Sequence, residues 1–311
     1  MQKTMTDVHE HLQELLKKYQ FKTFSKQINK MVRHSVHIRT SLVNIDDLPI
    51  ASSKFGGYPD LPDDVAWPEW KGMPLSFLGQ INLADVTEQT FSTELGDTGL
   101  LSFFYATAAR TWGIHAEDVG SWRVIYCSDP SICSRRKPRI ATAQFISYPT
   151  CSLAFQEIVQ LPSCSSLEID RLPMKADAFN RYGDMLWHEF PLRRDRGLFV
   201  QSAFAQASSY SYGDSVEHRL LGYPSEIQGE MQTYCLSSED TIFHGTSKSD
   251  FFKEQEAMNA KASEWRLLMQ FDTDDRAKMM WCDCGRLYFW IHKDDLNKKI
   301  FDKVWMVLQF H

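Results

Sequence analysis

Two cysteines and a histidine within residues 265 to 296, WRLLMQFDTDDRAKMMWCDCGRLYFWIHKDDL, suggest metal chemistry. Cys282, Cys284 and His292 are the soft ligand types that zinc prefers. A structural zinc site usually takes four ligands with two-residue gaps, whereas Cys-x-Cys places its thiols on opposite faces of a strand. We therefore expect no metal ion and no cofactor here.

Three aspartates in the same stretch, Asp272, Asp274 and Asp275, resemble the start of a calcium-binding loop. Such a loop has Gly at its sixth position and Glu at its twelfth, where this chain has Ala277 and Asp283. We interpret the segment as a solvated acidic loop. An incidental cation site is the alternative.

His218 is the best acid/base candidate, because it precedes the Gly-Tyr-Pro sequence at 222–224 and imidazole titrates near neutrality. Together with Asp272 and Asp274 it would serve a hydrolase-like or metal-dependent enzyme. A histidine that only bonds a backbone carbonyl is the alternative. The chain lacks the G-x-S-x-G, H-E-x-x-H, P-loop and G-x-G-x-x-G motifs, which favours a binding role over catalysis.

The elements that carry these residues occur twice, because four sequence blocks recur in the same order. KFGGYP (54–59) matches RLLGYP (219–224), and LSFLGQIN (75–82) matches WRLLMQFD (265–272). DTGLLSFF (97–104) matches DCGRLYFW (283–290), and WRVIYC (122–127) matches WMVLQF (305–310). Collinear blocks predict an internal duplication with two similar units, about 54–127 and 219–310.

Strand alternation places the polar residues of the second block pair on one face. That face carries Gln80 and Asn82 in one unit, and Gln270 and Asp272 in the other. These four, with Gln228 of the IQG stretch, form the candidate ligand-binding set. Either they bond backbone groups and tie the units together, or they line a pocket near a pseudo-twofold axis that His218 also enters.

The spacing of apolar residues predicts the remaining helices and strands. Apolar residues at helical spacing over 6–33 predict helices, so residues 1–35 form an N-terminal helical segment docked on a body of residues 36–311. Residues 177–190 predict another helix, and alternating patterns predict strands elsewhere. The fold class is α+β, largely antiparallel β-sheet with an internal duplication and N-terminal helices.

Several motifs together resemble the YwqG-like family of bacterial proteins, a domain of unknown function. They are SKFGGYPDLP, PLSFLGQINLAD, HRLLGYP with IQG behind it, WRLLMQFDTDD, and GRLYFWI followed by FDKVWMVLQ. The resemblance covers about residue 40 to the C-terminus and implies an α+β fold with an internal duplication. Where that family typically has Trp-Gly-Asp-Ala-Gly, this chain has Trp-Cys-Asp-Cys-Gly at 281–285, which argues against a thiol chemistry shared by the family.

Composition limits location and partners. The net charge of −6 gives no basic footprint for nucleic acid, and the short basic run at 135–139 is interpreted as a solvated loop. The sequence has no apolar run that resembles a signal peptide or a membrane span, and its seven cysteines form no C-x-x-C pair. We expect a cytoplasmic, non-enzymatic protein that binds a protein or small molecule and modulates or neutralises a partner.

Overall fold

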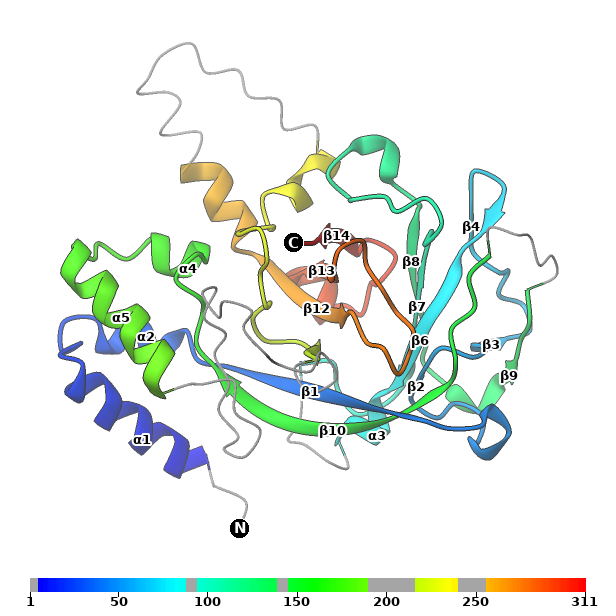
Figure 1. Ribbon diagram of the computed structural model, residues 1–311, viewed down its shortest axis with the longest axis horizontal. Helices are drawn as coiled ribbons and strands as arrows, with labels where there is room; N and C mark the ends of the chain where they lie inside the picture. The colour runs from blue at the N-terminus through cyan, green and yellow to red at the C-terminus, as the bar shows by residue number, and fades with distance from the viewer. Residues whose placement is uncertain (1–4, 88–93, 139–144, 190–215, 240–255) are drawn as a thin grey trace.

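The centre of the fold is a ten-stranded antiparallel sheet with the order β14-β13-β12-β11-β1-β10-β2-β6-β7-β8. The structure is a computed structural model that describes residues 5–87, 94–138, 145–189, 216–239 and 256–311. The two longest strands, β1 (Arg33–Leu42) and β10 (Cys151–Gln160), pair along their whole length in the middle of the sheet (Figure 1). The other sheet strands are β2 (Lys54–Phe55), β6 (Ser76–Asn82), β7 (Leu100–Tyr105), β8 (Trp122–Cys127), β11 (His218–Leu220), β12 (Trp265–Asp272), β13 (Arg286–His292) and β14 (Trp305–Gln309).

Four strands lie on each side of the central pair, and each set includes one β-bulge at a matching position. In β6 the register against β7 shifts between Phe77 and Gly79. In β12 the register against β13 shifts between Leu267 and Met269. These residues occupy the third and fifth positions of the LSFLGQIN and WRLLMQFD blocks, so both blocks form a strand with the same local irregularity.

The two outer parts of the sheet pack against each other through aromatic side chains. The Phe103 ring of β7 lies 5.3 Å from the Phe289 ring of β13, measured between centroids. The Trp122 ring of β8 lies 5.1 Å from the Trp305 ring of β14. Because each aromatic ring buries a large apolar area, this contact supplies the main hydrophobic core of the body.

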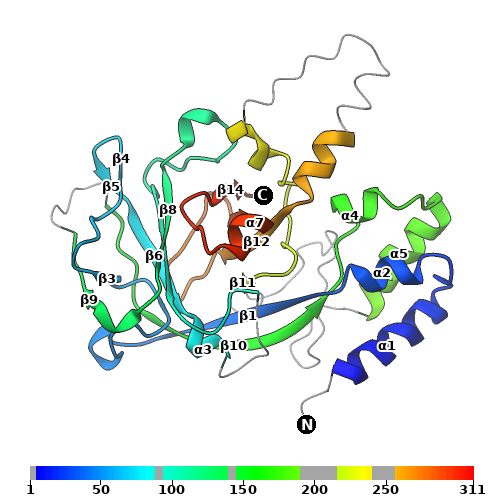
Figure 2. The same cartoon turned by 180° about the vertical axis from the view of Figure 1, so that it is seen from behind.

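The helices gather mainly at one end of the two long strands, away from the outer sheet strands (Figures 1 and 2). Leu12 and Leu16 of the first helix pack with Tyr182 and Met185 of α5 in a separate apolar cluster. The labelled α-helices are α1 (Met5–Lys18), α2 (Ser25–Lys30), α3 (Leu83–Thr87), α4 (Leu167–Asp170), α5 (Ala176–Glu189) and α7 (Lys293–Asn297), and residues 256–262 are also helical. Within the described residues, every helix is too short or too polar to cross a membrane.

The α+β class with a large antiparallel sheet is confirmed, and helices occur where the apolar periodicity predicts them at both 6–33 and 177–190. The proline-rich stretch after residue 53 forms short strands besides loops. These are β3 (Asp60–Pro62), β4 (Glu69–Trp70) and β5 (Met73–Pro74), and β3 pairs with β9 (Cys133–Arg135).

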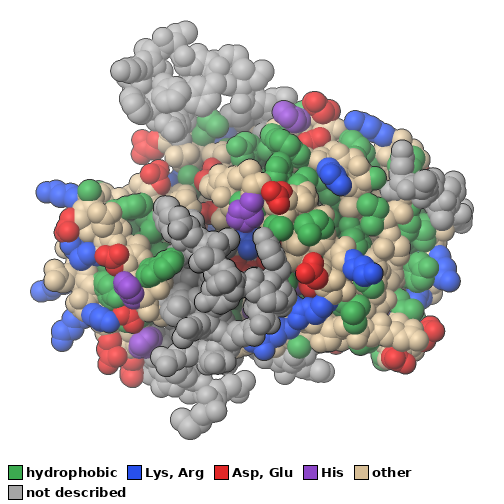
Figure 3. Space-filling view, in the orientation of Figure 1, with side chains coloured by type: hydrophobic (Ala, Val, Ile, Leu, Met, Phe, Trp, Pro, Cys, Tyr) green, Lys and Arg blue, Asp and Glu red, His purple; other side chains and the backbone are tan. Residues whose placement is uncertain are grey.

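The first two residues of the basic run at 135–139 are not solvated as predicted, whereas Lys137 is exposed and Arg139 lies outside the described residues. Arg135 Nε donates to Asp60 Oδ1 at 3.0 Å, and Arg136 donates to the carbonyl of Pro62 at 2.9 Å. Asp60 also pairs with Lys54 inside the protein, where both side chains are fully buried. Burial lowers the pKa of Lys54 to about 8 although Asp60 opposes this shift. On the face in Figure 3, the basic and acidic side chains of the described residues are interspersed.

Candidate functional site

Two buried glutamines in equivalent strands make the same pair of backbone hydrogen bonds. Gln80 of β6 and Gln270 of β12 are both fully buried. Each side-chain amide donates to a carbonyl that precedes the neighbouring short strand, and each Oε1 accepts from an N–H that follows the Gly-Tyr-Pro turn. The partners are Ser52 O at 2.9 Å and Asp60 N at 2.8 Å for Gln80, and Glu217 O at 2.5 Å and Ser225 N at 2.8 Å for Gln270. These amides therefore bond backbone groups.

The next polar position of each strand also makes an equivalent contact. The Asn82 N–H donates to Ser53 Oγ at 2.9 Å, and the Asp272 N–H donates to His218 Nδ1 at 3.0 Å. Gln228 lies apart from these contacts, because its side chain is exposed and its backbone N–H donates to a side-chain oxygen of β14.

Asp272 belongs to a buried cluster of two carboxylates and two guanidinium groups. Arg286 Nε donates to Asp272 Oδ1 at 2.9 Å, and the side chains of Arg219 and Glu217 lie 3.4 Å apart. Burial alone would lower the pKa of Arg286, but Asp272 and its neighbours outweigh burial and raise it. Burial would raise the pKa of Glu217, but Arg219 and Arg286 outweigh that effect and lower it. The two carboxylates and the two guanidinium groups of this cluster balance in charge. Asp272, at the start of the acidic loop, is therefore already paired with Arg286 and is not a free ligand for a cation.

His218 is fixed by both of its ring nitrogens. Since Nδ1 accepts the Asp272 N–H, the proton is on Nε2, which faces Asp274 Oδ2 at 3.3 Å. The Thr40 hydroxyl of β1 donates to the same oxygen of Asp274. His218 and Asp274 are both 0% exposed. Burial would raise the pKa of Asp274, but the hydrogen bonds from His218 and Thr40 hold it well below its ordinary value.

Asp274 also shapes the loop of residues 273–285 that follows β12. Its Oδ1 accepts the Arg276 N–H at 2.9 Å, and its backbone forms an isolated β-bridge with Met279. Further along the loop, Trp281 Nε1 donates to the carbonyl of Asp272 at 3.1 Å. The prediction of a solvated acidic loop is therefore wrong for Asp272 and Asp274, which are buried and hold the loop against the sheet, whereas Asp275 is exposed.

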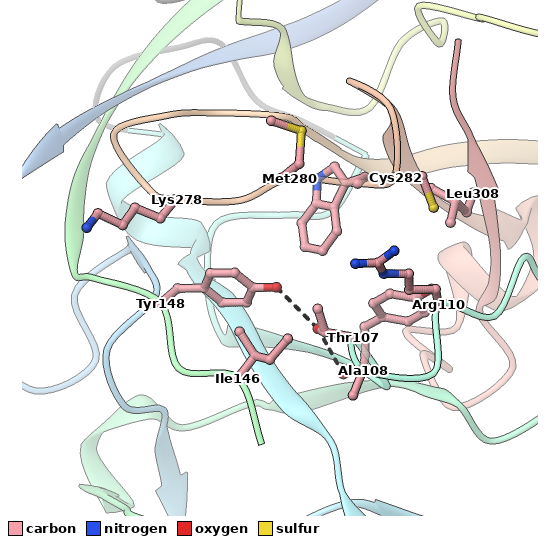
Figure 4. Close-up of a pocket in the computed structure, with 11 residues that line it drawn as sticks. Thr107, Ala108, Arg110, Ile146, Tyr148, Lys278, Met280, Cys282 and Leu308 are labelled. Atoms are coloured by element: carbon pink, nitrogen blue, oxygen red, sulfur yellow. Dashed lines mark hydrogen bonds between the residues drawn. The ribbon is translucent and has the colours of Figure 1, made fainter. Parts of the chain in front are cut away.

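This loop forms one wall of a cavity of about 420 Å³, the junction cavity (Figure 4). The other walls come from the segment after β7 and from the segment that leads into β10. The lining residues are Tyr105, Thr107, Ala108, Arg110, Ile146, Tyr148, Lys278, Met280, Trp281, Cys282 and Leu308. A volume of this size is in the range of small-molecule sites.

Three residues that line the junction cavity have backbone conformations that residues other than glycine rarely adopt. Arg110, Lys278 and Cys282 have φ angles of 51°, 51° and 53°. A left-handed conformation costs about 1–2 kcal/mol per residue, and such strain concentrates at functional sites. The strain on two walls of one cavity makes it the strongest candidate site in the described part of the chain.

The residues that the sequence predicted as a site hold the loop beside the cavity, but most of them do not line it. His218 and Asp272 adjoin each other, but neither they nor Gln80, Asn82, Gln270 and Asp274 line the cavity. Cys282 lines it, whereas His292 lies at the far end of β13 and precedes α7. The described residues contain no group of three or more His, Cys, Asp or Glu side chains arranged to hold a metal ion. Positive charge close to aromatic residues was the only sequence signal for Arg110 and Lys278.

The chain matches the family model described as Domain of unknown function (DUF1963) over residues 53–309. The chain belongs to this family. The matched part of the DUF1963 chain contains both sets of outer strands, the buried clusters and every residue of the junction cavity. The comparison with curated proteins found no match.

We expect Asp274→Asn to destabilise the protein by about 2–3 kcal/mol, because a buried acceptor of charge-assisted hydrogen bonds is lost. Amide hydrogen exchange at the bridge between Asp274 and Met279 should accelerate. The control is Asp275→Asn, since Asp275 is exposed and should change stability by less than about 0.5 kcal/mol. Equal losses in both variants, measured by urea unfolding, would contradict the role assigned to Asp274.

We also expect stability to fall as the pH drops from about 6.5 to about 4, because of His37 of β1. Burial, followed by the charge of Arg219, lowers the pKa of His37 to about 4; His218 and Arg39 add to the lowering, and Glu217 opposes it. In this pH window the unfolded chain binds a proton that the folded protein does not. This lowers the free energy of unfolding by at most about 3 kcal/mol.

Urea unfolding of wild type and His37→Asn across this window measures the effect. The variant should lose less stability than wild type between pH 6.5 and pH 4, and the difference at higher pH gives the pH-independent cost of the substitution. Parallel pH profiles would show that His37 does not contribute.

Proposed function

We propose that this protein is a cytosolic, non-enzymatic binding protein and that the junction cavity holds a small-molecule ligand. The observation that carries the proposal is the combination of cavity size, a largely apolar lining and strained loop residues at one place. The odd number and irregular spacing of the seven cysteines support a reducing compartment. A bound ligand would cover part of both loops, so binding would alter the surface offered to a protein partner.

The surroundings of His218 support a binding role over an enzymatic one. A general base needs a free lone pair within reach of a substrate. In His218 the Nδ1 lone pair accepts the Asp272 N–H, and Nε2 faces Asp274. A hydrolase-like or metal-dependent mechanism with His218, Asp272 and Asp274 would need this buried set to open.

We further propose that the two sets of outer strands arose by internal duplication and belong to a YwqG-like scaffold. The matching bulges and the matching bonds of Gln80 and Gln270 support this. Phe103 also contacts Phe289, its counterpart in the aligned blocks, as expected for elements related by a twofold axis.

The two loop junctions of such a scaffold differ. At one junction the loops after β7 and β12 surround the cavity. At the other, the Phe301 ring of the loop before β14 lies 5.1 Å from the Tyr126 ring of β8, and Lys299 lies over the same ring. A ligand site at one junction and packed side chains at the other fit the divergence of two copies after duplication.

We expect Ala108→Trp to fill the junction cavity and remove ligand-induced stabilisation. The matched control is Ala109→Trp, because Ala109 is an exposed neighbour that does not line this cavity. A thermal-shift screen of small metabolites should give compounds that raise the melting temperature of wild type and Ala109→Trp but not of Ala108→Trp. Compounds that stabilise both variants equally, or a screen without any stabilising compound, would contradict the proposal.

A further inference from the structure

We infer that the junction cavity selects a small apolar acid, whose carboxylate or phosphate contacts Arg110. This inference rests on the proposed function and names the chemical class of its ligand. It follows from which polar groups of the cavity are already bonded within the protein and which are not.

The aromatic side chains behind the cavity are buried and pack edge to face on one another, and their polar groups are bonded within the protein. The Tyr105 hydroxyl donates to the Thr111 carbonyl at 2.7 Å, and the Tyr148 hydroxyl donates to Thr107 at 3.3 Å. Trp281 Nε1 donates to a backbone carbonyl. Burial raises the pKa of Tyr148 to about 12, so its hydroxyl stays neutral. The apolar surface open to a ligand therefore comes from Ala108, Ile146 and Met280, with the buried rings behind it.

The positive charges at the cavity remain available. Among the described residues, the side chains of Arg110 and Lys278 have no hydrogen-bond or ion-pair partner. None of the residues that line the cavity is acidic. An unpaired guanidinium group next to apolar walls favours a carboxylate or phosphate, which it can bind through two parallel hydrogen bonds.

The two cations contribute unequally because of where they lie. In Figure 4 the Arg110 guanidinium group projects into the cavity on the side of Cys282, whereas the Lys278 ammonium group extends away on the opposite side. Arg110 is thus the direct contact for the anion. Lys278 adds a longer-range attraction that salt screens.

The test compares indole-3-acetate with its neutral amide, indole-3-acetamide, which has nearly the same shape. Dissociation constants come from NMR titrations of the full-length protein at low salt, with probes at up to millimolar concentration. We expect the acid to bind at least about fivefold more tightly than the amide. Arg110→Gln should weaken acid binding about tenfold and Lys278→Gln about twofold, without effect on amide binding.

Matched controls are Arg123→Gln and Lys298→Gln, because both residues are exposed and lie outside the cavity. Both controls should bind the acid as wild type does. Equal binding of acid and amide, with both abolished by Ala108→Trp, would overturn the inference about charge while leaving the proposed site intact. Acid binding that survives Ala108→Trp, or no binding of the acid, would overturn the inference, and the metabolite screen then decides separately whether the proposed function stands.

Discussion

The buried carboxylate of Asp274 joins three parts of the molecule that are far apart in sequence. It accepts hydrogen bonds from the hydroxyl of Thr40 in the central strand β1 and from the backbone N–H of Arg276 in its own loop. It also faces the ring of His218 in β11. A buried carboxylate is costly unless donors surround it, so these donors stabilise the observed position of the loop. Because the same loop continues to Trp281 and Cys282, the shape of the junction cavity depends on this contact.

The body of the protein is held by contacts that are nearly the same on both sides of the central strands. The amide groups of Gln80 and Gln270 each bond two backbone groups and so fix the turns beside β2 and β11. Such a scaffold tolerates change in its loops, where the two sides differ most. The site that we propose lies where the equivalence ends, at the loops around the junction cavity.

The sequence predicted the sheet strands well, because alternation and the repeated blocks constrain them strongly. It also identified His218, Asp272 and Asp274 as special, although their contacts support a loop. It could not predict the cavity, since its walls come from three segments distant in sequence. The left-handed conformations of Arg110, Lys278 and Cys282 could not be predicted either, because a glycine in the sequence is the usual sign of such a conformation and these residues are not glycine. The prediction that Arg135 is solvated was wrong because its partner Asp60 lies far away in the chain.

A crystal structure with indole-3-acetate tests the central claim most directly, because it locates the ligand and its charged group together. The account predicts the indole ring against Ala108, Ile146 and Met280, and the carboxylate within hydrogen-bonding distance of the Arg110 guanidinium group. It also predicts that the loop of residues 273–285 keeps its bond to His218 through Asp274. A ligand bound outside this cavity, or with its carboxylate directed away from Arg110, would contradict the account.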